Sequence, residues 1–460
     1  MSAADFGTLP LAPALLDNLR ALGFASMTPI QALSLPAIIA GHDVLGQART
    51  GSGKTAAFGL GLLTHLDARR FAVQALVLCP TRELADQVAS ALRDLARAIP
   101  NIKIATLCGG APLLAQTSSL AGGVHIVVGT PGRVEAHLRK GSLQLNALTM
   151  LVLDEADRML DMGFEESVDN IIRQAPAERQ TLLFSATYPD SVQHIAERTL
   201  RQPVSARVDE GEQRPSVEQS FVCVADDAER LAVLQRLLHR PAAALVFCNT
   251  RKTTQLVADT LRSARFSAAA LHGDMEQRER DLTLLRFANQ STRVLVATDV
   301  AARGLDIQGL DAVVNYELAH EVDVHVHRIG RTGRAGAEGV AITLYGAAEQ
   351  PRVAALAEQL EITVRAATLP PRRLLEQRPP KALMVTLRID GGKKQKLRKG
   401  DVLGALTGAE GIAGEQVGRI DVLPAATYVA VRREAARAAL AKLTEGRLKG
   451  RRFRVRRLHG

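Results

Sequence analysis

The 460-residue chain is too long for one hydrophobic core, because cores stop growing at about 250–300 residues and longer chains divide into domains. With 47% hydrophobic and 23% charged residues and no apolar run of the roughly 20 residues that cross a bilayer, the composition argues against a membrane protein. The first ten residues show no secretory signal, and the four cysteines form no C-x-x-C pair, so we expect a cytoplasmic protein without a zinc knuckle or a disulfide framework.

The net charge of +10 comes from the C-terminal end of the chain. Residues 371–460 hold 22 Lys and Arg against 8 Asp and Glu, whereas the remainder holds 36 against 40. Such a basic tail favours a polyanion as partner, most often nucleic acid. A solvated tail without a specific partner is the alternative.

The first helix with a clear start follows Thr28, which precedes Pro29 at the first helical position. Gln31 then lies in the first turn, where its amide can both donate to and accept from the N6/N7 edge of adenine. Phe6 is placed to stack on the same ring. If these two residues stood alone, a surface glutamine and a core phenylalanine would be the better interpretation.

Residues 44–55 read "VLGQARTGSGKT" and predict a strand, a phosphate-binding loop and the start of a helix. Backbone N–H groups of the glycine turn and the helix N-terminus form a nest for phosphate oxygens. Lys54 would reach the β and γ phosphates, and Thr55 would bind Mg²⁺. The general pattern has Gly at the position of Ala48. The expected nucleotide-binding residues are Ala48, Arg49, Thr50, Gly51, Ser52, Gly53, Lys54 and Thr55.

An internal repeat organises the first 370 residues. The segment 76–82, "LVLCPTR", returns as "LVFCNTR" at 245–251, a shift of 169, and "IVVGT" at 126–130 returns as "VLVAT" at 294–298, a shift of 168. Both halves alternate short β-branched runs with helical patterns, which is the signature of parallel sheets covered by helices. The sequence therefore predicts two duplicated α/β domains.

The segment "LVLDEADRML" at 151–160 ends a buried strand in three acids. A phosphate-binding loop needs a second strand whose terminal carboxylate faces the metal, and Asp154 fits that position. Glu155 can orient and deprotonate the attacking water. The alternative is a helix cap, for which Asp154 or Asp157 would suffice.

The polar stretch 209–220 and the Pro-rich stretch 369–380 predict domain boundaries. We expect domains at 1–208, 219–365 and 382–458, the last a βαββαβ module that resembles an RNA-recognition (RRM) fold. Within the second domain, "HRIGRTGR" at 327–334 places Arg331 and Arg334 three residues apart. They can stabilise the transition state at a γ-phosphate held by the first domain, and contacts to nucleic acid are the competing interpretation.

These motifs, taken together and in order, resemble the DEAD-box ATP-dependent RNA helicases over about residues 1–365. The motifs are the segment ending at Gln31, "ARTGSGKT" (48–55), "PTRELA" (80–85), "TPGR" (130–133), "DEAD" (154–157), "SAT" (185–187), "LVFCNT" (245–250), "VATDVAARGLDI" (296–307) and "HRIGRTGR" (327–334). The resemblance implies two RecA-like domains that bind ATP, Mg²⁺ and RNA, and it accounts for Ala48.

The resemblance also implies roles for single residues. Asp306 would contact the nucleotide ribose, and Asp157, Ser185, Thr187 and His327 would couple hydrolysis to strand separation. Contacts to the RNA backbone position a strand without reading its sequence. The implied backbone contacts are Thr81, Arg82, Gly110, Thr130 and Arg133 in the first domain, and Thr250, Gly273, Thr298 and Arg303 in the second.

The third domain resembles the C-terminal domain of DbpA-type helicases, which bind a hairpin of 23S ribosomal RNA during large-subunit assembly. Only Tyr428 is an aromatic residue in a predicted central strand, so broad base stacking is not expected. We expect phosphate contacts from Lys393, Lys394, Lys396, Arg398, Lys399, Arg451, Arg452, Arg454 and Arg456.

The sequence thus predicts a monomeric RNA-dependent ATPase that unwinds RNA and is directed to 23S rRNA, with no membrane partner and no metal cluster. Two alternatives remain. The chain can be an ATP-gated RNA clamp that remodels by binding alone, or a DNA translocase, because RecA-like domains serve both.

Overall fold

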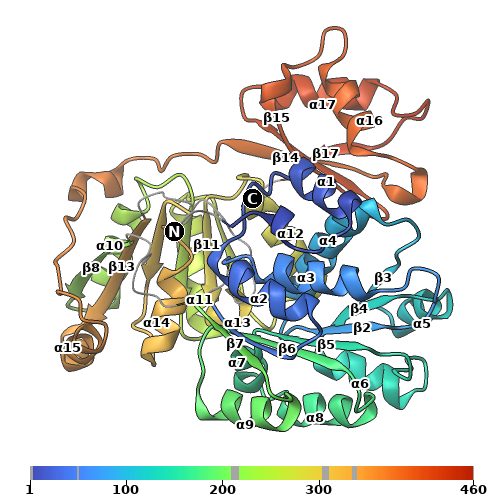
Figure 1. The fold of residues 1–460 in the computed structure, drawn as a ribbon. Coiled ribbons are helices and arrows are strands. Elements are labelled where there is room, and N and C mark those ends of the chain that lie inside the picture. Colours follow the sequence, from blue (N-terminus) through green and yellow to red (C-terminus); the bar gives the residue numbers. More distant parts are fainter. Residues whose placement is uncertain (1–3, 49–50, 209–216, 303–309, 334–338, 459–460) are drawn as a thin grey trace. The chain divides into compact units, whose positions relative to one another are not determined.

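The computed structural model describes residues 4–48, 51–208, 217–302, 310–333 and 339–458. Its contacts divide the chain into two compact units near residue 212. The first unit is one α/β domain, called lobe 1, and the second holds another α/β domain, called lobe 2, and a C-terminal module (Figure 1). No helix in the described ranges is long and apolar enough to cross a membrane.

Lobe 1 is built on a seven-stranded parallel sheet with the order β3-β4-β2-β5-β6-β1-β7. Its strands are β1 (Val44–Gln47), β2 (Ala75–Leu78), β3 (Ile104–Leu107), β4 (Ile126–Gly129), β5 (Met150–Asp154), β6 (Gln180–Ser185) and β7 (Val204–Arg207). Its helices are α1 (Pro13–Ala21), α2 (Pro29–Ile39), α3 (Lys54–His65), α4 (Arg82–Leu95), α5 (Leu113–Ala121), α6 (Pro131–Arg139), α7 (Ala156–Asp161), α8 (Glu165–Gln174) and α9 (Asp190–Thr199).

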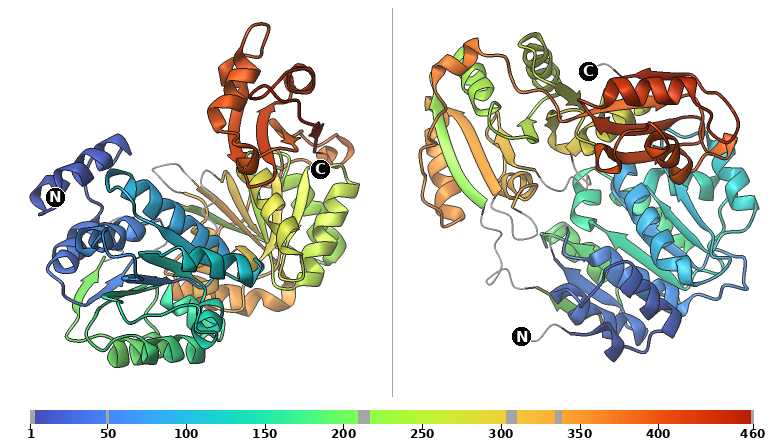
Figure 2. Two further views of the ribbon diagram at one scale, coloured as in Figure 1. Left: turned by 90° about the vertical axis from the view of Figure 1, so that its right-hand side faces the viewer. Right: turned by 90° about the horizontal axis from the view of Figure 1, so that it is seen from above.

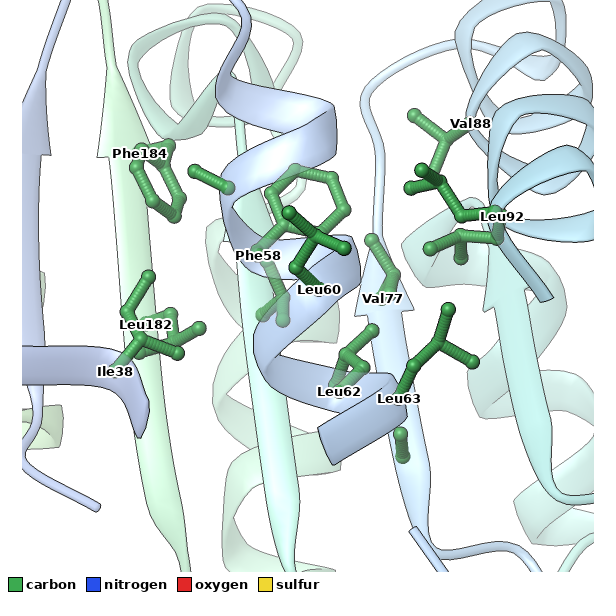
Figure 3. Packing of buried hydrophobic residues seen from close by; sticks show 14 of the residues in the cluster. Ile38, Phe58, Leu60, Leu62, Leu63, Val77, Val88, Leu92, Leu182 and Phe184 are labelled. Carbon is green, nitrogen blue, oxygen red and sulfur yellow. The ribbon is translucent and has the colours of Figure 1, made fainter. Parts of the chain in front are cut away.

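Both faces of this sheet are buried, because successive residues of a strand point to opposite sides. Leu182 and Phe184 of β6 pack under α2 and α3, whereas Leu183 packs under the layer that contains α6 to α9. Figure 3 shows the first layer, where Phe58 of α3 meets Phe184 with ring centroids 5.7 Å apart. This two-sided core fixes the edge of the sheet at which the site residues lie.

Lobe 2 has a six-stranded parallel sheet with the order β10-β11-β9-β12-β13-β8. Its strands are β8 (Val217–Val224), β9 (Ala244–Cys248), β10 (Ala268–Leu271), β11 (Val294–Thr298), β12 (Ala312–Asn315) and β13 (Gly339–Gly346). Its helices are α10 (Asp227–Leu237), α11 (Arg251–Ser263), α12 (Gln277–Ala288), α13 (Asp299–Ala302), α14 (Val322–Ile329) and α15 (Gln350–Gln359). The order of its first five strands repeats that of β3-β4-β2-β5-β6, as a duplicated domain requires.

The polar stretch 209–220, expected to be a connection, ends inside a strand. β8 begins at Val217 and pairs with β13 along its whole length. Glu218 and Gln219 are tolerated there because β8 is an edge strand. The polar composition of residues 209–220 therefore did not indicate where the strand begins.

The C-terminal module is an antiparallel sheet of order β15-β16-β14-β17 with two helices on one face (Figure 2). Its elements are β14 (Met384–Ile389), α16 (Lys399–Thr407), β15 (Val417–Val422), β16 (Thr427–Arg432), α17 (Ala436–Glu445) and β17 (Val455–Arg457). The predicted βαββαβ order and the predicted pair of parallel-sheet domains are both confirmed.

Candidate functional site

The strand order of lobe 1 sorts the predicted site residues along one edge of the sheet. The carboxyl ends of parallel strands meet at the same edge, where open α/β sheets bind ligands. The neighbours β5, β6 and β1 lead into Asp154, Ser185 and the phosphate-binding loop, whereas β3, β4 and β2 lead into Gly110, Thr130 and Thr81. Residues predicted for ATP thus occupy one half of the edge, and residues predicted for RNA the other.

The phosphate-binding loop joins β1 to α3, as predicted. Gly51 and Gly53 have φ angles of 86° and 95°, a left-handed conformation that side chains rarely adopt. Lys54 is the first residue of α3, and its buried ammonium donates to the Ala48 carbonyl at 3.0 Å. The Ser52 hydroxyl is buried and has no hydrogen-bond partner among the described residues. Arg49 and Thr50 lie outside the described residues.

Gln31 connects the helix after Thr28 to this loop. Its amide oxygen accepts from the Thr28 N–H at 2.9 Å, and its amide nitrogen donates to the Gly53 carbonyl at 3.1 Å. A Cβ at Gly53 would lie 2.5 Å from that nitrogen, so glycine is required for space as well as for φ. The amide keeps one lone pair and one N–H for a ligand, so adenine recognition by Gln31 stays a prediction.

Phe6 is buried and meets Phe24 edge-on, with ring centroids 6.3 Å apart. Both rings line a pocket of about 230 Å³ formed by residues 5–25, which also contains Asp5 and Arg20. Gln31 is not part of this lining. Stacking of Phe6 on a base stays a prediction.

Asp154 ends β5 in a buried position. Burial, opposed by the charge of Lys54 and assisted by that of Glu155, raises its pKa to about 6. Its Oδ1 has no hydrogen-bond partner among the described residues. A buried carboxylate oxygen of this kind fits a cation ligand. Since no group of three His, Cys, Asp or Glu side chains in the described part of the chain could hold a metal, Mg²⁺ would depend on Asp154, Thr55 and the nucleotide.

Glu155 adopts a left-handed conformation, with φ at 52° and ψ at 53°, directly before α7. The conformation is strained for a residue with a Cβ, and such strain is concentrated at functional sites. Its carboxylate lies 3.2 Å from the guanidinium of Arg158, and both side chains are almost fully buried. This ion pair orients the carboxylate.

Asp157 joins the strand ends of β5 and β6. Its Oδ2 accepts from the Thr187 N–H at 2.9 Å and from the Thr187 hydroxyl at 2.8 Å. Its own N–H donates to the Ser185 hydroxyl at 3.3 Å. Burial alone would raise the pKa of Asp157, but the hydrogen bonds from Thr187 outweigh it and the pKa is lowered. Asp157, Ser185 and Thr187, the predicted coupling residues of lobe 1, therefore form one network.

The predicted RNA contacts of lobe 1 begin or precede helices. Thr81 caps α4 through its hydroxyl, which accepts from the Leu84 N–H at 3.3 Å, and Thr130 precedes α6. Arg82 lies 3.6 Å from the Asp86 carboxylate. Arg133 donates to the Ala111 carbonyl at 2.9 Å and to the Gln116 side chain at 3.1 Å. Gln116, which sequence reasoning missed, holds Arg133 in place.

Lobe 2 repeats this arrangement after β9, β10 and β11. Thr250 caps α11 by accepting from the Thr253 N–H at 3.0 Å, as Thr81 does in lobe 1. Gly273 follows β10 and is exposed, and Thr298 ends β11. The structure brings these three residues to one sheet edge, because β10, β11 and β9 are neighbours.

The predicted arginines of lobe 2 are described only in part. His327 lies in α14, and Arg331 follows it with 3% of its surface exposed. Arg303, Asp306 and Arg334 lie outside the described residues. Their assignments stay predictions.

Arg328 belongs to the motif at 327–334, but the sequence alone assigns it no role. Its buried guanidinium donates to both carboxylate oxygens of Asp299 at 2.7 Å, to the Asn249 side chain at 2.7 Å and to the Glu317 carbonyl at 2.8 Å. It also lies 5.3 Å from the ring centroid of Phe247. Arg328 thus ties α14 to the ends of β9, β11 and β12.

In the C-terminal module, two basic segments distant in sequence come together. The Asp390 N–H donates to the Arg454 carbonyl at 2.9 Å, and a Cβ at Gly391 would lie 2.4 Å from the Phe453 ring. We call the exposed cations beside this contact the basic patch. The basic patch comprises Lys393, Lys394, Lys396, Arg398, Lys399, Arg451, Arg452, Arg454 and Arg456. Tyr428, the only aromatic residue in β14 or β16, is 8% exposed.

Comparison with known families covers all three domains. Residues 28–195 match the DEAD/DEAH box helicase family, residues 229–336 the helicase conserved C-terminal domain, and residues 386–457 the DbpA RNA binding domain.

Known proteins agree with these matches. The chain is 55% identical over 454 residues to the ATP-dependent RNA helicase DbpA of Escherichia coli, covering 98% of this chain and 99% of that protein. It is 40% identical to the DEAD-box ATP-dependent RNA helicase CshA of Geobacillus kaustophilus, covering 82% and 78%. The structure of S. cerevisiae Dbp5 bound to RNA and ADP BeF3 superposes with a TM-score of 0.72 at 30% identity, covering 79% and 96%. The chain therefore belongs to the DEAD-box ATP-dependent RNA helicases and carries a DbpA RNA-binding domain.

Proposed function

We propose that this RNA helicase hydrolyses Mg²⁺-bound ATP on lobe 1 and uses the cycle to separate short RNA duplexes in 23S rRNA during large-subunit assembly. It would act in the cytoplasm as a monomer. The observation that carries the RNA target is the basic patch, where two segments of the module are held together at one end of its sheet.

The chemistry would take place at the ATP half of the lobe 1 edge. Thr55 and Asp154 would hold Mg²⁺, which withdraws charge from the phosphates, and Lys54 would move from the Ala48 carbonyl to the β and γ phosphates. Glu155, whose carboxylate Arg158 orients, would accept a proton from the attacking water. Arg331 and Arg334 would complete the site from lobe 2 when the lobes close.

Coupling would run through Asp157. Its carboxylate and N–H connect the strand that carries Asp154 to Ser185 and Thr187. A movement of the residues that contact the phosphates would therefore be transmitted through Asp157 to the end of β6. The RNA half of the same edge, with Thr81, Thr130 and Arg133, would hold one strand by its backbone and bend it out of the duplex.

The module would keep this core near its substrate. Contacts from lysine and arginine to phosphates do not read bases, so specificity would come from the shape of a folded hairpin. The E. coli relative is named an ATP-dependent RNA helicase, which supports duplex separation by this chain.

The proposal is tested by RNA-stimulated ATPase and strand-displacement assays on a 23S rRNA fragment. Changing Lys393→Gln together with Arg454→Gln should raise the RNA concentration for half-maximal stimulation on the order of tenfold, with the maximal rate kept. Arg437→Gln with Arg419→Gln is the control, because it removes an equal charge on α17 and on β15, the sheet edge opposite β17. Equal effects of the two pairs would contradict targeting by the basic patch.

The same assays separate the alternatives. Deleting residues 381–460 should leave a weak ATPase that no longer prefers ribosomal RNA. Stimulation by DNA of the same sequence would favour a translocase. ATP-dependent binding without strand displacement would favour a clamp.

A further inference from the structure

A second basic site lies in the unit formed by lobe 2 and the module, and its Arg457 directly follows Arg456 of the basic patch. It is a pocket of about 330 Å³ at the start of β14. It is lined by lobe 2 residues at and after the ends of α11 and α12, by the chain before β14, and by module residues near the ends of β16 and β17. Its lining contains six cations and no acidic residue. The six are Arg262, Arg265, Arg286, Lys381, Arg433 and Arg457.

The pocket is held by a defined contact between lobe 2 and the module. Thr386 of β14 accepts from the Asn289 amide at 2.9 Å and shares a hydrogen bond of 2.7 Å with the Ser291 hydroxyl, and all three residues are buried. Arg293 donates to the Pro380 carbonyl at 2.8 Å and so fixes the chain that enters β14. The contact covers the side of β14 that faces away from the module's helices.

Two cations of the pocket have no acidic partner among the residues that the structure describes. Arg286 is half-buried, its Nε has no hydrogen-bond partner among the described residues, and burial lowers its pKa. Arg433 is used for structure, because its Nε donates to the Ala382 carbonyl at 2.6 Å. Burial and then the nearby Arg457 lower the pKa of Arg433. A cluster of like charges that is partly removed from water favours an anion between them.

Arg265 gives an independent observation. It follows α11 with φ at 67°, at a helix end where the Phe266 N–H donates to the Leu261 carbonyl at 2.9 Å. Glycine is the usual residue at this position because it has no Cβ. Arg265 therefore keeps its charge at the pocket in a position where glycine would suit the backbone better. Of the other cations, Arg262 pairs with Asp259, whereas Arg457 extends from the edge strand β17.

We propose that this pocket binds phosphate groups of the RNA backbone, so that an RNA held by the basic patch is also gripped between the module and lobe 2. Lobe 2 would thereby sense which RNA the module carries. The inference rests on the RNA-helicase assignment but not on the identity of the RNA.

The test uses the full chain carrying both Arg265→Gly and Arg286→Met, which we call the pocket variant. Both changes remove a charge from a strained or uncompensated position, so the melting temperature should stay equal or rise. The affinity for a labelled rRNA hairpin with a duplex extension should fall on the order of tenfold. The slope of log Kobs against log salt should become shallower by about 0.7–0.9 for each lost phosphate contact.

Two control variants and a second ligand, inorganic phosphate, complete the test. Arg265→Lys should restore most of the affinity, and Arg69→Gln with Arg70→Gln, two exposed lobe 1 arginines, should leave it unchanged. An unchanged affinity and salt slope in the pocket variant would overturn the proposal. So would a variant that loses only binding of inorganic phosphate, which would make the pocket a free-anion site. Each variant is compared with the wild type on the same RNA, so a failure of 23S rRNA preference is read separately.

Discussion

Thr187 donates two hydrogen bonds to one carboxylate oxygen of Asp157, from its N–H at 2.9 Å and from its hydroxyl at 2.8 Å. The pair links the last acid of the β5 motif to the segment after β6. The charge of Lys54 also lowers the pKa of Asp157, so we propose that the pair transmits a change at the phosphates to the segment after β6.

Replacing Thr187 by Val removes the hydroxyl hydrogen bond and keeps the backbone one. A hydrogen bond to a charged group contributes about 1.5–3 kcal/mol, so the network should loosen without unfolding. We expect fewer duplexes separated per ATP hydrolysed, with the ATPase rate within about twofold of wild type. Thr117→Val, which removes a hydroxyl bonded within α5, is the control and should change neither quantity. A parallel loss of both activities would argue against a coupling role.

Gly53→Ala should weaken ATP binding for two reasons. The left-handed conformation costs a residue with a Cβ on the order of 1 kcal/mol, and the added carbon would meet the Gln31 amide at 2.5 Å. We expect the KM for ATP to rise at least about tenfold.

Gly41→Ala separates the two causes. Gly41 has φ at 85° but no atom within 4 Å of its Cβ position. It should lower the free energy of unfolding on the order of 1 kcal/mol and leave the KM unchanged. Similar KM values for both variants would contradict the role of Gln31 in holding the loop.

Arg328→Lys should destabilise lobe 2. A lysine cannot reproduce the two parallel bonds to Asp299 or reach Asn249 and Glu317 together. The partly buried Asp299 carboxylate would lose part of its compensation, and the free energy of unfolding, measured by denaturant titration, should fall by about 2–4 kcal/mol. Arg352→Lys, at an exposed pair with Glu349, should change it by less than about 0.5 kcal/mol. Equal effects would show that the Arg328 network contributes no more than a surface pair.

The stability of lobe 2 should fall in acid because of His325. Burial, followed by the charge of Arg328, lowers its pKa to about 4, and its Nε2 lies 3.0 Å from the Gln219 amide oxygen. The unfolded chain binds this proton near pH 6.5 and the folded chain only near 4, so stability present above pH 6.5 is lost as the pH falls towards 4. The loss is on the order of 3 kcal/mol.

Hydrogen exchange of the β8 and α14 amides between pH 7 and pH 4.5 measures this loss. His325→Gln stays neutral and should flatten the dependence. The same pH dependence in this variant would assign the loss to other groups.

The sequence could predict the parts of the fold that repeat. The shift of 169 residues aligns Thr81 with Thr250, and both hydroxyls cap the helix that follows an equivalent strand. A strand, a cap and a helix are local features, so a local pattern reveals them. The phosphate-binding loop and the Asp154–Asp157 motif were predictable for the same reason.

Other features depend on tertiary contacts that no local pattern records. Arg328 lies in the same sequence motif as Arg331. Only the packing of α14 against the ends of β9, β11 and β12 shows that Arg328 has a structural role. Gln116 holds Arg133 from a helix 17 residues away in sequence. The pocket of like charges forms because the module lies against α12. The Pro-rich segment 369–380 predicted only a domain boundary and not this contact.

The proposed catalysis at the end of β5 depends on Glu155. The RNA-stimulated ATPase rate of the Glu155→Gln variant tests it most directly. Glu155→Gln keeps the shape of the side chain and removes the base. We predict a fall in turnover of at least about a hundredfold, with ATP and RNA affinities within about threefold of wild type. Turnover within about tenfold of wild type would contradict catalysis at this strand end.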